Sequence, residues 1–208
     1  MELIGRVVLG KLPAPKKFSV KKNADKCGRE KSDLSVVYSG DGGLANVVIW
    51  VEGIKAGKDL TKDGLTLRNI TCTYEPRVAT AAAGSTLEIK NFDGIQMIAF
   101  GLLQGVKTPW FQTTLPVKGL GYKRKLDAPG LLNVHSDPDQ PWATAWVYVF
   151  SHPYATVTDE SGYFTLDKLP DGEYTLHAWH ETFGEKQQPL SIKADPTGNR
   201  ARADLRFE

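Results

Sequence analysis

The segment Trp146–Glu181 constrains the fold more than any other part of the chain. It reads WVYVFSHPYATVTDESGYFTLDKLPDGEYTLHAWHE, in which short aromatic and β-branched runs alternate with compact turns. Gly162, Pro170 and Gly172 lie in those turns. Glycine readily adopts positive φ and proline fixes φ, so both residue types favour tight turns between strands. The pattern predicts a closely connected antiparallel β-unit.

Short apolar or alternating runs recur along the rest of the chain, and helical periodicity is nearly absent. Many short strands separated by Gly, Pro, Asp and Asn predict an all-β sandwich or Greek-key barrel. Val47–Ile49 and Trp146–Phe150 are apolar at every position, so we expect them to be central strands. Ile95–Leu103 fits either a short helix or a strand.

The charge balance argues against a nucleic-acid partner. The chain has 26 basic and 24 acidic residues, a formal net charge of +2. Such a balance gives no bulk attraction to nucleic acid or to a membrane surface. No apolar run is long enough to span a bilayer, so we expect no membrane span. With 41% hydrophobic residues in 208, the chain has enough apolar side chains for a packed core.

The two cysteines, Cys27 and Cys72, are compatible with one disulfide or with two free thiols, and their number does not choose between these. A signal peptide is not visible, because the strand-like run Glu2–Leu9 follows Met1 directly. This leaves either a cytoplasmic protein or a mature secreted chain.

Two turn motifs in the C-terminal part point to a known fold. Thr158–Phe164 reads Thr-Asp-Glu-Ser-Gly-Tyr-Phe, and Leu169–Tyr174 reads Leu-Pro-Asp-Gly-Glu-Tyr. These motifs resemble the turns of the carboxypeptidase regulatory-like, or transthyretin-like, β-sandwich. The resemblance covers about Ala145–Glu208 and implies that fold. It implies little about function, because such domains are accessory modules with many partners.

A second set of short motifs lies in the preceding part, roughly Leu34–Trp146. They are NVVIWV at Asn46–Val51, CTYEPRV at Cys72–Val78, the Asn91-Phe92-Asp93 turn and PWATAW at Pro141–Trp146. Together they resemble the cupredoxin-like domain of secreted bacterial proteins labelled methylamine-utilisation or plastocyanin-like. Those proteins commonly carry the regulatory-like module directly after it.

The copper ligands of that family are missing here. A type 1 copper site needs one thiolate and two imidazoles, with a weak axial thioether. In copper-binding relatives a His follows the Asn-x-Asp turn, and a later loop reads Cys-x-x-His-Pro-Trp-Met. Here Gln96 or Met97 stands at the first His position, Gln140 and Ala143 stand at the later His and Met positions, and residues 137–143 contain no Cys. The resemblance therefore implies the scaffold without blue-copper electron transfer.

This resemblance implies an all-β protein with a Greek-key cupredoxin-like sandwich over residues 1–144. A smaller transthyretin-like sandwich would follow over residues 145–208 and pack against it. We expect a non-catalytic binding or structural module in the periplasm or outside the cell. A protein partner or self-assembly through edge strands, within a larger complex or filament, fits such a module. In that setting Cys27 and Cys72 are expected to form a disulfide.

The histidines suggest an alternative function, a metal-binding or electron-transfer accessory protein that holds copper or zinc. Its candidate ligands are His152, His180 and Glu181, joined by His135. Strand alternation puts His180 on the face opposite His177, so these two cannot share one ion in a regular strand. The competing interpretation is that His152 and His180 satisfy buried polar groups, and then no cofactor is bound.

Aromatic residues in loops suggest a binding surface. Trp110, Phe111 and Tyr122 lie in the least regular part of the chain and are candidates for contacting a protein partner. The same residue types stack on sugars, so a carbohydrate-binding module is a further alternative. Trp142 is expected instead to fill the end of the sandwich. The sequence has no nucleophile elbow, phosphate loop or dinucleotide fingerprint, so we do not expect an enzyme.

Overall fold

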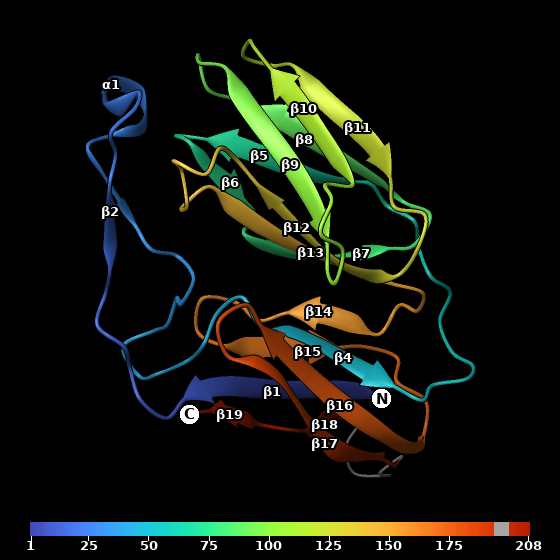
Figure 1. Ribbon diagram of the computed structural model, residues 1–208. Helices are drawn as coiled ribbons and strands as arrows, with labels where there is room; N and C mark the ends of the chain where they lie inside the picture. Colours follow the sequence, from blue (N-terminus) through green and yellow to red (C-terminus); the bar gives the residue numbers. More distant parts are fainter. Residues whose placement is uncertain (194–199) are drawn as a thin grey trace. The chain divides into compact units, whose positions relative to one another are not determined.

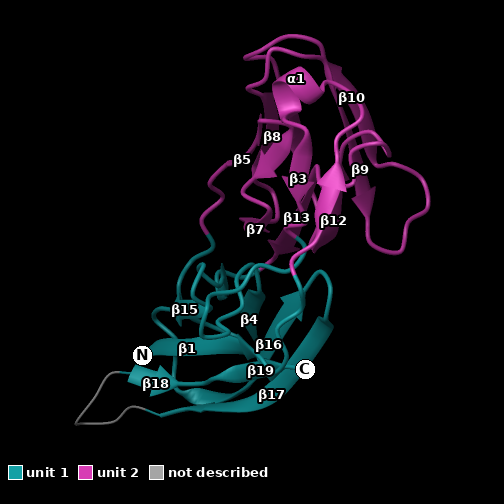
Figure 2. Cartoon of the chain, turned by 90° about the vertical axis from the view of Figure 1, so that its left-hand side faces the viewer, with its two compact units in different colours: residues 1–14, 35–60, 152–208 teal, residues 15–34, 61–151 magenta. Residues whose placement is uncertain are grey.

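The computed structural model describes residues 1–193 and 200–208, and it is almost entirely β-structure (Figure 1). The all-β prediction is confirmed. The chain forms two compact units that are interleaved in sequence (Figure 2). Unit 1 contains residues 1–14, 35–60 and 152–208, and unit 2 contains residues 15–34 and 61–151. These units do not follow the single boundary predicted between residues 144 and 145.

Unit 2 is a sandwich of two sheets, with a small hairpin attached. One sheet has the order β10-β9-β12-β13-β7, from β7 (Val78–Ala82), β9 (Met97–Leu103), β10 (Phe111–Leu115), β12 (Gly130–His135) and β13 (Thr144–Phe150). The other has the order β11-β8-β5-β6, from β5 (Leu65–Ile70), β6 (Thr73–Glu75), β8 (Thr86–Asn91) and β11 (Gly121–Lys125). The hairpin pairs β2 (Lys17–Ser19) with β3 (Glu30–Ser32), and the short helix α1 (Ala24–Cys27) lies between them in sequence.

Alternating side chains of the two sheets form the core of unit 2. Leu87 and Ile89 of β8 are buried, whereas Glu88 and Lys90 between them are not. This period of two places every second residue on the inner face. Burying each such aliphatic side chain contributes about 1.5–3 kcal/mol. The same core includes Val20 and Cys27, so residues 15–34 belong to this unit by packing as well as by disulfide.

Unit 1 has its own core between two further sheets. One has the order β14-β4-β16-β17, from β4 (Val48–Glu52), β14 (Ala155–Val157), β16 (Gly172–His180) and β17 (Gly184–Ile192). In the other, β1 (Glu2–Leu9) pairs antiparallel with β15 (Tyr163–Leu166) and parallel with β18 (Arg200–Arg202) and β19 (Leu205–Phe207).

The pairing of β1 explains why the compact units differ from the predicted division. Val7 donates its backbone N–H to the carbonyl of Gly162 at 2.8 Å, so the turn before β15 lies directly against β1. Gly162 has φ +80, and a Cβ there would stand 2.3 Å from the Val7 carbonyl oxygen, which leaves room only for glycine. The N-terminal strand thus belongs with the C-terminal part, and β13 belongs to unit 2.

Two predicted central strands are confirmed, since β4 lies between β14 and β16, and β13 lies between β12 and β7. The segment that fitted either a helix or a strand is a strand, β9. Among residues 1–193 and 200–208, no helix combines the length and the apolar character needed to cross a membrane.

Candidate functional site

Unit 2 contains a pocket with a volume of about 360 Å³. Its lining comes from three segments that are distant in the sequence: Lys22 and Asn23, residues 95–98, and the pair Asp137 and Gln140. The site therefore depends on the fold to bring ammonium, carboxylate and amide groups to one place.

The wall formed by residues 95–98 is fixed by the Asn91-Phe92-Asp93 turn that precedes it. Asn91 is fully buried, and its side-chain amide donates to the carbonyls of Ile95 at 2.8 Å and Leu115 at 2.9 Å. Its side-chain oxygen accepts the backbone N–H of Asp93 at 2.8 Å. One buried amide thus holds both ends of the loop that delivers Gln96 to the pocket.

The wall formed by Lys22 and Asn23 is held by α1 and the disulfide. Asn23 has φ 57, and its carbonyl accepts the backbone N–H of Lys26 at 2.9 Å and of Cys27 at 2.8 Å. Cys27 is bonded to Cys72, with the two Cα atoms 5.4 Å apart, so the expected disulfide is present. The covalent link ties this wall to the turn between β5 and β6.

The third wall is the loop between β12 and β13. The backbone N–H of Gln140 donates to the Asp137 carbonyl at 2.8 Å, and the Asp137 carboxylate accepts the backbone N–H of Asp139 at 3.1 Å. Trp142 follows this turn and is 3% exposed in the core, as predicted for a residue that fills the sandwich end.

A buried hydroxyl pair supports the start of this loop. Ser136 Oγ donates to the Tyr74 hydroxyl at 3.3 Å, and both side chains are buried. Burial raises the pKa of Tyr74 to about 12, and the bond from Ser136 opposes that rise. The phenol is therefore neutral at physiological pH, and its partner Ser136 directly precedes Asp137 in the sequence.

The pocket is lined by two side chains of opposite charge. Lys22 and Asp137 line it from different segments. Within the part of the chain that the structure describes, neither forms an ion pair. Asn23, Gln96 and Gln140 add amide groups, each of which both donates and accepts. The arrangement can bind a small polar molecule through charge and hydrogen bonds.

The positions that correspond to copper ligands in the family resemblance come together here. Gln96, Met97, Asp137 and Gln140 all line the pocket. The lining offers amide and carboxylate oxygens and one thioether, without a thiolate or an imidazole. Type 1 copper requires a thiolate and imidazoles, so these residues do not fit that centre.

The four candidate metal ligands are not brought together by the fold. The register pairs Trp50 of β4 with both Ala155 and His177, and it pairs Val48 with both Val157 and Trp179. His152 precedes β14 and His180 ends β16, so these two histidines lie toward opposite ends of β4. Within residues 1–193 and 200–208, no three His, Cys, Asp or Glu side chains are grouped to hold a metal ion.

Each of these histidines has a contact of a structural kind. His152 Nδ1 accepts the backbone N–H of Tyr154 at 3.3 Å, and His180 Nδ1 accepts that of Thr182 at 3.1 Å. The His180 ring is fully buried and packs against Phe183 and Phe207, with centroid distances of 4.9 and 6.4 Å. Burial lowers the pKa of His152, and the nearby Glu52 carboxylate partly opposes this.

The other two proposed ligands, His135 and Glu181, lie in different units. His135 stacks on Phe100 in unit 2, with centroids 5.2 Å apart, and its Nδ1 lies 2.7 Å from the Ser136 carbonyl oxygen. Glu181 directly follows β16 in unit 1.

Sequence reasoning missed one ionic cluster, in unit 1. His177 Nε2 lies 2.9 Å from Glu52 and His177 Nδ1 lies 2.8 Å from Glu185, while its ring stacks on Trp50 at 4.7 Å. Of these two carboxylate contacts, the one between His177 Nδ1 and Glu185 is a hydrogen bond. Alternation separated His177 from His180 correctly, but it did not reveal these partners on the neighbouring strands.

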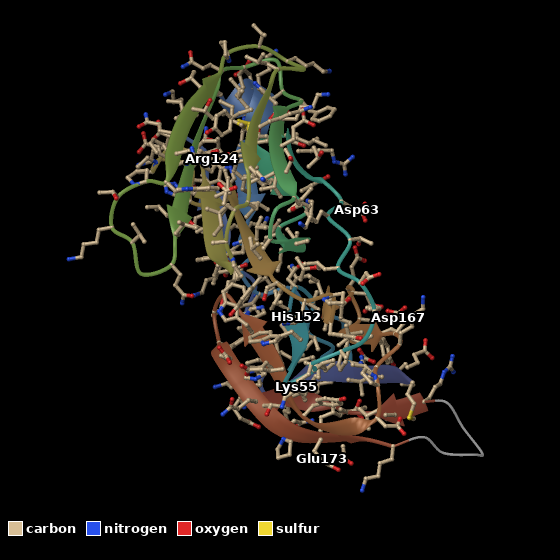
Figure 3. All side chains as sticks on the ribbon, turned by 90° about the vertical axis from the view of Figure 1, so that its right-hand side faces the viewer. Lys55, Asp63, Arg124, His152, Asp167 and Glu173 are labelled. Atoms are coloured by element: carbon tan, nitrogen blue, oxygen red, sulfur yellow. A yellow bond between two sulfur atoms is a disulfide. The ribbon has the colours of Figure 1, made fainter. Side chains whose placement is uncertain are left out.

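The predicted partner-binding aromatics form a cluster around Arg124, which Figure 3 labels. The Arg124 guanidinium lies 4.0 Å from the centroid of the Trp110 ring and 3.4 Å from the Tyr122 hydroxyl. The prediction does not hold for Phe111, whose side chain is 5% exposed and packs in the core. Its ring centroid lies 5.2 Å from that of Tyr122. Only Trp110 and Tyr122 of the three remain accessible.

Comparison with known proteins found similar solved structures. They include the copper-containing nitrite reductase NirK of Thermus scotoductus, at 20% sequence identity and a TM-score of 0.38. That alignment covers 50% of this chain and 25% of the reductase. A purple cupredoxin of Nitrosopumilus maritimus has 15% sequence identity and a TM-score of 0.35, and the alignment covers 42% of this chain and 99% of the cupredoxin. Amicyanin of Paracoccus versutus has 17% sequence identity and a TM-score of 0.37, and the alignment covers 49% of this chain and 97% of amicyanin.

This chain spans about a quarter of the length of the nitrite reductase that it matches. No family model and no curated protein matches the sequence. The strand pairing and the two cores described above define the fold of each unit without reference to these similarities.

Proposed function

We propose that this protein is a non-catalytic binding module of the periplasm or the extracellular space. In this proposal unit 2 is a cupredoxin-like scaffold whose type 1 copper site has been replaced by a polar pocket. The observation that carries it is the meeting of Gln96, Asp137 and Gln140 in one cavity, at positions where the family resemblance places copper ligands. A ligand held there would be bound by hydrogen bonds and charge.

The disulfide supports the proposed location. Disulfides persist in oxidising compartments and are rare in the cytosol. Cys27–Cys72 joins residues 45 apart and leaves no free cysteine in the chain. Fractionation of the native host, with the protein detected in each fraction, tests this part of the proposal. Recovery in the cytosol with reduced thiols would contradict it.

Addition of Cu(II), followed by visible absorption, tests the loss of the copper site. We expect no intense band, since only a thiolate–copper bond gives strong colour. The matched variant combines Q96H, D137C, Q140H and A143M, which supplies two imidazoles, a thiolate and a thioether. This variant is expected to become intensely coloured if the pocket occupies the copper position. A coloured wild-type protein would overturn the proposal.

A second candidate function is contact with a protein partner at the Trp110–Tyr122–Arg124 cluster. It is favoured by the 4.0 Å cation–π contact, because Trp, Tyr and Arg dominate binding hot spots. Co-purification with the native chain, compared with W110A, tests it. The matched control is Q112A, since Gln112 is an exposed neighbour on β10. Equal recovery of the same proteins by W110A and wild type would rule out this surface.

A further inference from the structure

We propose that the pocket in unit 2 binds a free amino acid, with Asp137 facing its ammonium group and Lys22 facing its carboxylate. This inference rests on the proposed function, because it names the ligand class of the same pocket. Its starting observation is that the two opposite charges line one cavity of about 360 Å³ from separate segments.

A zwitterion fits these charges better than an ion of one sign. A simple anion that pairs with Lys22 would also meet the Asp137 carboxylate, and a simple cation that pairs with Asp137 would meet the Lys22 ammonium. Charge–charge interactions near a protein surface are of similar size for attraction and repulsion at equal distance, so the unfavourable contact offsets the favourable one. A zwitterion avoids this conflict, because its ammonium can face Asp137 while its carboxylate faces Lys22.

The remaining lining suits the rest of an amino acid. Asn23, Gln96 and Gln140 each carry an N–H donor and a carbonyl acceptor, which can complete the hydrogen bonds of an ammonium and a carboxylate. Met97 and Ile98 add apolar surface for a side chain, and Met97 is only 5% exposed. The pocket therefore favours an amino acid whose side chain is apolar.

The volume limits the size of the ligand. Pockets for drug-sized molecules measure about 300–1,000 Å³, and this one lies near the lower end of that range. A free amino acid fits such a space, whereas a folded peptide or an oligosaccharide would extend well beyond it. The disulfide and the Asn91 amide fix two of the three walls, so the site is formed before a ligand arrives.

Isothermal titration of the full chain with each of the twenty common amino acids tests the proposal. We expect binding of apolar amino acids such as leucine. Leucinamide lacks the carboxylate and N-acetylleucine lacks the ammonium, and each is expected to bind at least tenfold more weakly. Glucose, a neutral polyol, is the control for binding by hydrogen bonds alone, and we expect it not to bind.

Two pairs of variants assign the charges. K22M is expected to weaken leucine binding at least tenfold and to abolish the preference for leucine over leucinamide. D137N is expected to weaken leucine binding at least tenfold and to abolish the preference for leucine over N-acetylleucine. The controls K21M and D139N change neighbouring residues that do not line the pocket, and they should bind as wild type does.

The proposal is overturned if no amino acid binds, if glucose binds in their place, or if K22M and D137N bind leucine as tightly as their controls. Any of these results leaves the copper-free binding role standing, since that role fails only on a coloured wild-type copper complex or a cytosolic location.

Discussion

The carboxylate of Asp93 accepts the backbone N–H of Cys72 at 2.7 Å, and its second oxygen accepts that of the preceding Thr71 at the same distance. Thr71 and Cys72 have φ values of 51 and 61, a conformation that costs energy for residues other than glycine. One side chain from the loop that shapes the pocket therefore stabilises the turn that carries the disulfide.

Replacing Asp93 by Ala should lower the free energy of unfolding by about 2–3 kcal/mol, because it removes two hydrogen bonds to a charged acceptor. D93N keeps one acceptor oxygen and should lose about half as much. Urea denaturation of each variant measures the change. D63A is the control, since Asp63 is exposed in the same unit, and it should stay within about 0.5 kcal/mol of wild type. Equal stability of D93A and D63A would contradict the prediction.

Removing the disulfide by the double substitution C27S/C72S should lower the free energy of unfolding by about 4 kcal/mol on the chain-entropy estimate for a 45-residue separation. The affinity of the pocket for its ligand should fall as well, because Lys22 and Asn23 lose their covalent tether. Urea denaturation with and without dithiothreitol measures the first effect. Reductant should bring wild type close to the variant and leave the variant unchanged, and a loss below about 1 kcal/mol would show that the tether is dispensable.

Tyr74 should make stability depend on pH in the alkaline range. Its pKa is raised to about 12 in the folded protein, above the ordinary value of 10.0, so the folded state favours the neutral phenol. The resulting stabilisation is complete below pH 10 and is lost as the pH rises toward 12. Y74F should lose less stability than wild type over this interval, as measured by melting temperature. Parallel pH curves for the two proteins would argue against a raised pKa.

His152 should make stability depend on pH in the acid range. Burial lowers its pKa in the folded protein, so below the ordinary value of 6.5 the unfolded chain takes up a proton more readily than the folded one. Stability from this group is complete above pH 6.5 and falls as the pH drops toward the folded pKa. H152N should therefore lose less melting temperature than wild type between pH 7 and pH 5. An identical loss in both proteins would show that His152 does not control this response.

The sequence was informative where a pattern is local. Unbroken apolar runs marked β4 and β13 as central strands, and alternation put His177 and His180 on opposite faces. The turn at Asn91 and the loop from Asp137 were singled out by the family resemblance, and they support or line the pocket. Each of these features depends on residues that are close in sequence.

The failures involve partners that are distant in sequence. Nothing local in β1 shows that it pairs with β15, β18 and β19, so the division at residue 144 missed the interleaving. The contacts of His177 depend on Glu52 and Glu185 from two other strands. Phe111 was assigned to a loop surface because its neighbours are irregular, whereas the strand register turns it into the core.

The interleaving has a consequence for the order in which the protein is made. Residues 15–34 and 61–151 leave the ribosome before residue 152, so every strand of unit 2 is available early. By contrast β1, the first strand synthesised, lacks its neighbouring strands β15, β18 and β19 until the C-terminal part emerges. During that interval Leu3, Val7 and Leu9, which are buried in the finished protein, belong to a core that still lacks its C-terminal strands. The core of unit 1 can therefore be completed only after Leu205–Phe207 have been synthesised.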